Sequence, residues 1–285
     1  MSIVTSAVRI AATVWLITVL ACQQPGKKAD YPEEYVFDFG LYFEKLPPED
    51  NAPDRFTRDN KIFTVGRTFV YDYVIVRHGD SLKITCPFNP PQDADYMRVW
   101  DFISHRQENP EKIETISIKV QDGISNERQT EIKYNYQFSA DPGFEPFSST
   151  SGVVENGKNV WMHPHRDKYF MILELNPFPY IQRPFKIGTK WTWSLGIGDH
   201  WKDDRWKVWS GSITNTYEYE IASKEELETK IGTLDCWVVE ASAMSEIGAT
   251  GLIAYFHEQY GFVRLDYINI DKSRVSLTIS KVRER

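Results

Sequence analysis

TGLIAYFHEQYGFVRLDY, residues 250–267, decides the fold class. Apolar and polar residues alternate on both sides of the segment 258–261, which is the pattern of two half-buried antiparallel strands joined by a turn. Gly261 suits the left-handed backbone conformation that such a turn requires. The stretch therefore predicts a β-hairpin with strands over 250–257 and 261–269.

The same alternation extends outward from this hairpin along the chain. It predicts neighbouring strands over 233–243 and 274–282, and earlier ones around 69–75, 116–120, 132–138 and 191–197. These segments are amphipathic, unlike the continuous apolar runs of a buried parallel sheet. The sequence thus predicts a mainly β protein built on a large curved antiparallel sheet, as a half-barrel or a sandwich.

Two short helices interrupt the strand pattern. Apolar residues at helical spacing predict one over 93–106, with Asp93 or Asp95 as its N-cap. A second is predicted over 165–175, before Pro177 ends it. We expect the sheet to wrap partly around a helix and to enclose an apolar cavity. The Pro-, Gly- and Ser-rich stretch 139–158 is a candidate boundary between two lobes.

The composition excludes one class of function. The chain of 285 residues carries 33 Lys and Arg against 40 Asp and Glu, a formal net charge of −7. A general nucleic-acid binder needs a basic face that releases phosphate counterions, so no nucleic-acid partner is expected. Aromatic residues at 14% favour β structure.

The N-terminus predicts export and lipidation. Arg9 precedes an uncharged, mainly apolar run over 10–20, which is shorter than the roughly 20 apolar residues that span a bilayer. Ala21-Cys22 at its end resembles the lipobox of bacterial lipoproteins, in which cleavage precedes the cysteine and its thiol carries a diacylglycerol. The alternative is an ordinary signal peptide cut nearby, with Cys22 incidental.

These signals divide the chain into a signal peptide over 1–21, a lipid-anchored tether over 22–34 and a β-rich domain over 35–285. Residue 23 is Gln and not the Asp that retains enterobacterial lipoproteins in the inner membrane. The resemblance therefore implies an outer-membrane lipoprotein that faces the periplasm and is held there by acyl chains such as palmitate.

Two further cysteines, Cys86 and Cys236, are an even number in an oxidising compartment. A bridge between them would close a loop of about 150 residues and contribute roughly 5 kcal/mol in the chain-entropy model. The alternative is two buried free thiols, because Cys236 shares a strand face with Leu234 and Val238.

Familiar catalytic signatures are missing from the sequence, which favours a binding protein over an enzyme. His163 and His165 would place two imidazoles on one face of an extended segment, with Asp199 and His200 as further ligands of a metal. The alternative is a pair of hydrogen-bonded or capping histidines. Because Arg166 beside them disfavours a cation, neither a metal nor a cofactor is expected.

Tryptophans and polar residues are interleaved over 191–209. The tryptophans are Trp191, Trp193, Trp201, Trp206 and Trp209, and the polar residues are Asp199, His200, Asp203 and Asp204. We interpret the first two indoles as a face for an apolar ligand, a lipid or an envelope protein, with the other three at its rim. One alternative is a glycan platform in which indoles stack on sugars and carboxylates bind hydroxyls. Another is a core strand followed by a polar hairpin tip.

Two stretches resemble known envelope proteins. The C-terminal stretch contains Gly232-Thr233-Leu234, Cys236, Tyr255-Phe256 and Tyr260-Gly261-Phe262-Val263. The middle stretch contains Leu173-Glu174, Asn176 and Pro177-Phe178-Pro179. The C-terminal stretch resembles the meander of uncharacterised bacterial envelope proteins whose fold is similar to lipoprotein carriers of the Lol type. The middle stretch resembles uncharacterised lipoproteins of the Bacteroidota. The resemblance implies a half-barrel for an acyl chain or a partner, without catalytic residues.

Exposure separates the functions that remain. A glycan platform needs solvent-facing indoles near carboxylates, whereas a lipid carrier needs them inside a closed apolar cavity. A structural subunit of an envelope complex predicts an exposed apolar patch and no cavity.

Overall fold

The computed structural model describes residues 35–46, 55–122, 128–143 and 147–284. The predicted signal peptide, Cys22 and the tether 22–34 lie outside these residues. Within the described part, none of the helices has both the length and the apolar character needed to cross a bilayer.

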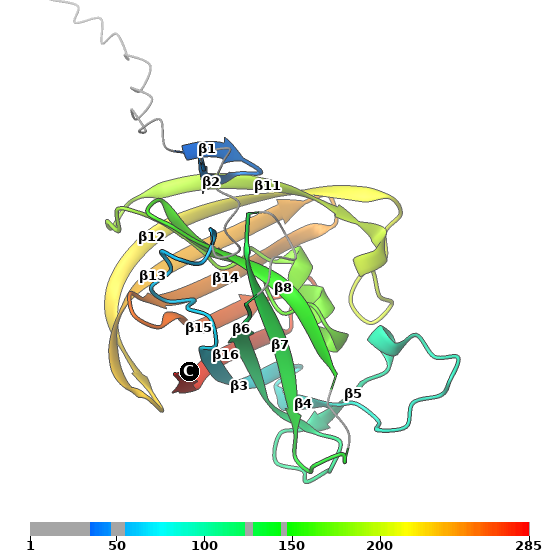
Figure 1. Cartoon of the computed structure of the whole chain (residues 1–285). Helices are drawn as coiled ribbons and strands as arrows, with labels where there is room; N and C mark the ends of the chain where they lie inside the picture. The colour runs from blue at the N-terminus through cyan, green and yellow to red at the C-terminus, as the bar shows by residue number, and fades with distance from the viewer. Residues whose placement is uncertain (1–34, 47–54, 123–127, 144–146, 285) are drawn as a thin grey trace, which may run out of the picture.

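One antiparallel sheet of 14 strands makes up most of the fold, and the hairpin β1–β2 forms a separate two-stranded sheet (Figure 1). The order across the sheet is β10-β9-β8-β7-β6-β3-β16-β15-β14-β13-β12-β11, with β4 paired to β3 and β5 to β4. The strands are β1 Tyr35–Asp38, β2 Leu41–Glu44, β3 Thr68–Arg77, β4 Asp80–Thr85, β5 Asp101–Ser104, β6 Ile113–Val120, β7 Thr130–Phe138, β8 Ser148–Glu155, β9 Asn159–Met162, β10 Tyr180–Gln182, β11 Lys190–Gly198, β12 Ser212–Thr229, β13 Gly232–Ser245, β14 Gly248–His257, β15 Gly261–Ile268 and β16 Arg274–Arg283.

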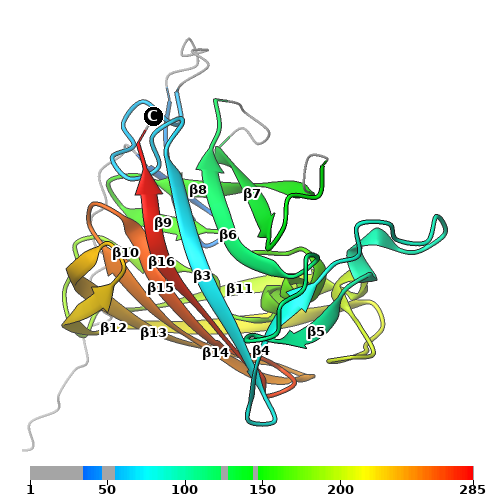
Figure 2. The ribbon, with the colours of Figure 1, turned by 90° about the horizontal axis from the view of Figure 1, so that it is seen from below.

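The first long strand, β3, pairs with the last strand, β16, in the middle of the sheet (Figure 2). On one side of this pair lie β6 to β10, and on the other side lie β15 down to β11. Each half of the sheet is thus one continuous stretch of the chain, and the two halves meet at the ladder between the first and last long strands.

The sheet curls without closing into a barrel. Its two end strands, β10 and β11, are neighbours in the chain but are not hydrogen-bonded to each other. Their inward side chains nevertheless meet, since the ring centroids of Tyr180 and Trp191 lie 5.4 Å apart. The predicted fold class, a mainly β protein with a large curved antiparallel sheet, is confirmed.

A short helix lies inside the curl. The 3₁₀ segment η2, Lys168–Leu175, has all eight residues buried. It ends at Asn176, which is extended and precedes Pro177. The predicted helix over 165–175 is therefore present from residue 168 onward, and the apolar face of the sheet packs around it.

The helix predicted over 93–106 is wrong beyond its first turn. Asp95 does cap a 3₁₀ turn, η1 (Tyr96–Arg98), by accepting a hydrogen bond from the Met97 amide at 3.0 Å. At Val99 the backbone becomes extended, with φ −88° and ψ 92°. The chain then continues as β5, because pairing with β4 and burial of the Trp100 indole outweigh the local helical spacing.

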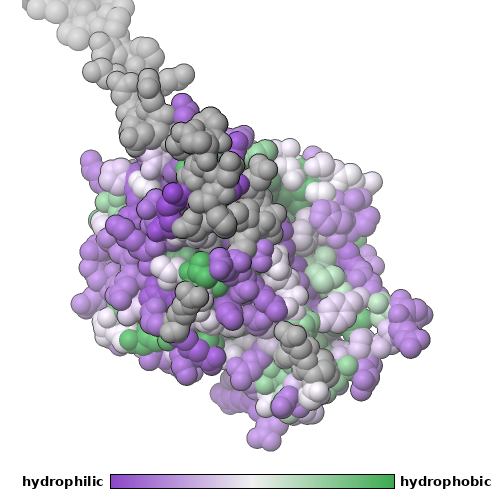
Figure 3. Space-filling model, in the orientation of Figure 1, coloured by the Kyte–Doolittle hydropathy of each residue, from purple (hydrophilic) through white to green (hydrophobic). Residues whose placement is uncertain are grey.

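The strands predicted around the opening hairpin are present as β13 to β16. Gly261 begins β15 at φ 71°, the left-handed conformation expected for it. The segment 139–158 supplies β8, which pairs with β7 and β9 within the same sheet. On the face shown in Figure 3, hydrophilic residues predominate and hydrophobic ones occur in small groups.

Candidate functional site

The two tryptophans proposed as a ligand face point into the filled interior. Trp191 and Trp193 on β11 are only 8% and 6% exposed. The Trp191 ring stacks on Tyr219 with centroids 5.2 Å apart and planes 3° apart, and Trp193 stacks on Tyr217 at 5.0 Å. The protein's own aromatic rings therefore occupy the space that an apolar ligand would need on this face.

The β1–β2 hairpin covers the same region from outside. A Cβ atom built on Gly40 would lie 2.1 Å from Cδ1 of Trp193. The Tyr180 hydroxyl donates to the Gly40 carbonyl at 3.2 Å, and Leu41 is buried in the core. The hairpin turn thus lies directly on the indole of Trp193.

The remaining tryptophans do not form an exposed rim. Trp206 and Trp209 are buried, and Trp201 is half-buried. Trp206 stacks on Trp100 at 6.3 Å and donates from Nε1 to the Trp201 carbonyl at 3.3 Å. These indoles are packed as structural residues of the loop that follows β11.

Two acidic residues of that loop, Asp199 and Asp203, already have partners within the protein. Asp203 is buried, and its carboxylate accepts from Arg98 at 2.8 Å and from Arg205 at 2.7 Å. Burial raises the pKa of Asp203, but hydrogen bonds and charge from the two arginines more than offset this and hold it below its usual value. Asp199 binds Lys202 and the Gly211 amide.

Asp204 and His200 are the two polar residues predicted for glycan contacts that are exposed to solvent. Asp204 is exposed to solvent, and His200 is exposed with its ring 4.6 Å from that of Trp201. The polar residues predicted for glycan contacts thus lie close together in one loop. The indoles of Trp206 and Trp209 in the same loop are turned away from solvent.

Near the start of the internal helix, His165 is buried and His163 is half-buried. His165 lies against the ring of Tyr134 at 4.3 Å, and burial lowers its pKa to about 3. Burial and the charge of Arg166 lower the pKa of His163 well below its ordinary value. Within the described residues, no group of three His, Cys, Asp or Glu side chains is arranged to hold a metal ion.

Buried charges position this helical segment. Arg166 Nε lies 3.2 Å from Glu174 Oε1, and burial raises the pKa of Glu174 to about 7 although the arginine opposes this. Asp167 accepts hydrogen bonds from the hydroxyls of Tyr136 and Ser149. The Asp167 carboxylate is thus hydrogen-bonded inside an aromatic core, whereas Arg166 and Glu174 form an ion pair without hydrogen-bond geometry, and both contacts indicate a structural role.

The predicted disulfide is not formed. Cys86 and Cys236 are separate buried thiols. Cys86 lies at a small hollow beside Tyr96 and Lys168, whereas Cys236 lies on β13 opposite Glu225. Burial raises the pKa of each thiol to about 12, so the alternative of two buried free thiols describes this pair.

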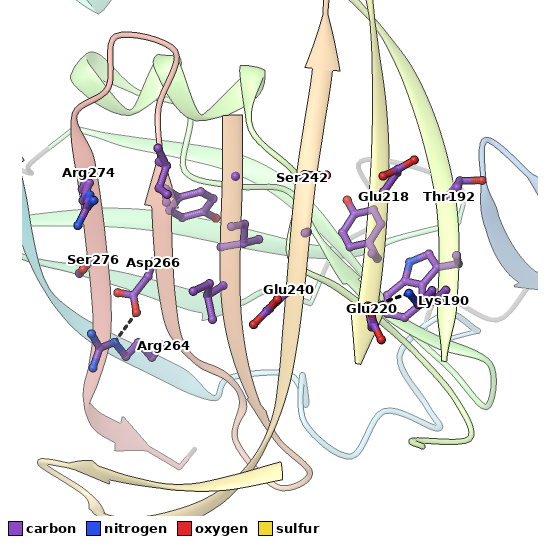
Figure 4. Close-up of a pocket in the computed structure, with 18 residues that line it drawn as sticks. Lys190, Thr192, Glu218, Glu220, Glu240, Ser242, Arg264, Asp266, Arg274 and Ser276 are labelled. Atoms are coloured by element: carbon purple, nitrogen blue, oxygen red, sulfur yellow. Dashed lines mark hydrogen bonds and ion pairs between the residues drawn. The ribbon is translucent and has the colours of Figure 1, made fainter. Parts of the chain in front are cut away.

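The large hollow of the molecule lies instead on the outward, polar face of β11 to β16 (Figure 4). It measures about 1160 Å³ and is open to solvent. The register places its outward residues in two rows across the strands. They are Lys190, Glu220, Glu240, Ile253, Asp266 and Ser276 in one row, and Thr192, Glu218, Ser242, Gly251, Ile268 and Arg274 in the other.

Charge is divided between the two ends of this hollow. Glu218, Glu220 and Glu240 lie on β12 and β13, and Arg264 and Arg274 lie on β15 and β16. Within the part of the chain that the structure describes, the side chains of Glu218, Glu240 and Arg274 have no hydrogen-bond or ion-pair partner. The acidic end therefore presents free carboxylates, and the basic end presents a free guanidinium.

Two ion pairs and two isoleucines complete the hollow. Lys190 Nζ lies 2.9 Å from Glu220, and Arg264 Nε lies 2.8 Å from Asp266 (Figure 4). Between the charged ends, Ile253 and Ile268 expose apolar surface. The arrangement can bind an elongated ligand that has opposite charges separated by an apolar part.

This hollow was not predicted from the sequence. Each of its residues is an ordinary outward-facing residue of an alternating strand, and only the strand register aligns them. One local signal was available, since Ile253 and Ile268 break the polar side of the alternation.

No family model matches the chain, and no curated protein matches it. Among solved structures, the chain is similar to a candidate lipoprotein from Parabacteroides distasonis, at 12% identity over 79% of this chain and 100% of that one, with a TM-score of 0.43. It is also similar to a candidate exported protein with a YmcC-like fold from Bacteroides fragilis, at 12% identity over 78% and 97%, with a TM-score of 0.40.

A third similarity is to the hypothetical lipoprotein YmcC from Escherichia coli, at 11% identity over 77% of this chain and 86% of that one, with a TM-score of 0.32. The three are uncharacterised lipoproteins or exported proteins, the kind of protein that the sequence resemblance named. No ligand or activity follows from similarities at these values.

Proposed function

We propose that this protein is a lipid-anchored envelope protein that docks a segment of a partner protein in the hollow on the outward face of β11 to β16. The observation that carries the proposal is the division of the hollow into an acidic end, an isoleucine centre and a basic end. It catalyses no reaction in this proposal and uses no cofactor.

The packing of the interior favours a protein partner over a carried lipid. A lipid carrier needs an apolar cavity, but Trp191 and Trp193 are stacked on Tyr219 and Tyr217. A glycan platform needs flat exposed indoles, and Trp206 and Trp209 are buried. The third interpretation, a structural subunit of an envelope complex with an exposed apolar patch, agrees best with the exposure of Ile253 and Ile268.

The dimensions of the hollow define the ligand. From Glu218 on β12 to Arg274 on β16 there are four strand spacings, about 19 Å. An extended peptide covers this distance in about six residues. The expected segment therefore carries a Lys or Arg and an Asp or Glu about six residues apart, with apolar residues between them.

Synthetic twelve-residue peptides test this chemistry on the purified mature chain with Cys22 replaced by Ser. We expect binding by peptides with a cation and an anion separated by six residues, and at least tenfold weaker binding when the separation is two residues. Glu218→Lys combined with Glu240→Lys should abolish this preference.

The matched control is Glu226→Lys combined with Glu228→Lys, which reverses two exposed charges on the same strand outside the hollow. Equal loss of binding in both double variants, or no dependence on charge spacing, contradicts the proposed docking site.

In this proposal the lipid anchor on Cys22 determines where in the cell envelope the protein lies. Ala21-Cys22 and the preceding apolar run support a lipid on Cys22, and Gln23 supports the outer membrane with the domain facing the periplasm. The mass of the protein from cells tests the anchor. Diacylglycerol and acyl chains on Cys22 support it, and a mature chain with an unmodified thiol or another cleavage site contradicts it.

A further inference from the structure

Aromatic side chains are unusually exposed on the β1–β2 hairpin. Phe39 at the turn is 80% exposed, and Phe37 is 59% exposed. Val36 beside them is also exposed, so three of the nine large hydrophobic residues that are exposed in the described part lie within positions 36–39. The hairpin therefore concentrates apolar surface at one point of the molecule.

Neither the folding of the chain nor the geometry of the turn explains why residue 39 is a phenylalanine. Its φ of 48° lies in the left-handed region, where a turn of this kind favours Asn, Asp or Gly. A phenylalanine there has a strained backbone and an uncovered ring. A contact outside the chain accounts for the uncovered ring.

The hairpin holds this apolar tip in a fixed position. The Tyr42 amide donates to Asn159 Oδ1 at 2.9 Å, and Asn156 donates to the Tyr42 carbonyl at 2.8 Å. On the inward side Leu41 and Phe43 are buried in the core. On the outward side the ring of Phe37 packs on Tyr42 at 4.9 Å.

The number of residues between Cys22 and the hairpin indicates what the hairpin tip contacts. Residue 35 begins the hairpin, and Cys22 precedes it by 13 residues. Thirteen residues can reach at most about 45 Å, even when fully extended. A lipid on Cys22 therefore holds the hairpin close to the bilayer that contains it.

Basic side chains at the hairpin are compatible with a position in the lipid headgroup layer. Arg128 Nη1 lies 2.8 Å from Asp38 Oδ2 in β1, and Lys158 Nζ lies 5.6 Å from the ring centroid of Tyr35. Aromatic rings flanked by basic side chains are typical of protein surfaces that sit at a membrane interface.

We infer that the tip of the β1–β2 hairpin, with Phe37 and Phe39, inserts into the surface of the lipid bilayer to which the chain is anchored. This inference rests on the lipid anchor proposed above, and it goes beyond that anchor because it fixes which end of the domain faces the membrane. The hollow on β11 to β16 plays no part in it.

The test couples Cys22 of the mature chain to a maleimide lipid in vesicles of phosphatidylethanolamine and phosphatidylglycerol. The photoreactive analogue benzoylphenylalanine replaces either Phe39 or, as the control, Met244, which is 62% exposed on β13. After illumination, mass spectrometry measures the fraction of protein that carries a covalent lipid adduct. We expect at least ten times more adduct at position 39 than at position 244, and a severalfold decrease at position 39 when Phe37 is replaced by Ser.

Equal adduct yields at the two positions, or no adduct at position 39 on vesicle-coupled protein, would overturn the inference. Chemical coupling replaces cellular lipidation in this experiment, so its result does not depend on whether cells modify Cys22. The mass measurement on cellular protein tests the anchor separately, and the two failures are therefore distinguishable.

Discussion

Gly40 lies against the indole of Trp193 so closely that a Cβ atom at position 40 would be 2.1 Å from Cδ1 of the ring. Backbone from the N-terminal hairpin and a side chain of β11, far apart in the sequence, thus form one packed contact. The contact also requires the positive φ of 77° at Gly40.

Gly40→Ala should destabilise the protein by about 3 kcal/mol. Strain at positive φ contributes about 1 kcal/mol, and displacement of the Trp193 ring contributes the rest. Gly211→Ala is the matched control, because Gly211 has a φ of 73° and open space around it, so we expect a loss of only about 1 kcal/mol. Urea unfolding followed by tryptophan fluorescence measures both, and equal losses would show that the ring contact is unimportant.

Asp203→Asn should lower the free energy of unfolding by about 2 kcal/mol, because it leaves Arg98 and Arg205 without their shared carboxylate. Arg205 also stacks over the Trp100 ring at 3.7 Å, so the loss should extend to the packing of this indole. Asp204→Asn, at the exposed neighbour, should be neutral within about 0.5 kcal/mol. Thermal unfolding of the two variants decides between them, and similar melting temperatures would contradict the ion-pair network.

His165 should make the protein less stable in acid. Its pKa is about 3 in the folded state against an ordinary value of 6.5, so the unfolded chain alone binds this proton between these pH values. The free energy of unfolding therefore falls by about 1.4 kcal/mol per pH unit from this group as the pH decreases below 6.5. Between pH 6.5 and 5, His165→Phe should remove about 2 kcal/mol of that loss. Urea unfolding at both pH values measures the difference, and an unchanged loss in the variant would contradict it.

Glu174 acts in the opposite direction. Because its folded pKa is about 7 and its ordinary value is 4.5, the folded state holds a proton that the unfolded state has released between these pH values. Stability from this group rises as the pH falls from 7 to 4.5. Glu174→Gln should therefore steepen the loss of stability in acid, and denaturant titrations at several pH values that gave a shallower slope would disprove the assignment.

The two buried thiols should be unreactive in the folded protein. Burial raises the pKa of Cys86 and Cys236 to about 12, so little thiolate forms at pH 8. With Cys22 replaced by Ser, a disulfide-exchange reagent should modify no cysteine in buffer and two in concentrated urea. If no thiol reacts even in urea without reductant, the two cysteines are bridged after all.

The sequence predicted β11 and β13 to β16 because the alternation is strong there, but it did not predict β12. It failed at 93–106, where the spacing of Tyr96, Val99 and Trp100 fits a helix as well as it fits a turn followed by a strand. Strand pairing with β4 decided the outcome, and that contact is not local. Tertiary contacts override local preference in such short segments.

The candidate site was less accessible from sequence. Alternation placed Trp191 and Trp193 on the inward face correctly, but whether that face is hollow depends on Phe178, Tyr217 and Tyr219, which other elements contribute. The outward hollow depends on a register between six strands. Neither property is contained in the periodicity of one segment.

The ladder between β3 and β16 has a consequence for the order of synthesis. Although β3 is made early, one of its edges stays unpaired until the last strand, Arg274–Arg283, leaves the ribosome. The two halves of the sheet cannot be joined before β16 has been synthesised. A polypeptide whose two central strands pair late stays unfolded for longer. This property suits passage through a translocation pore before folding.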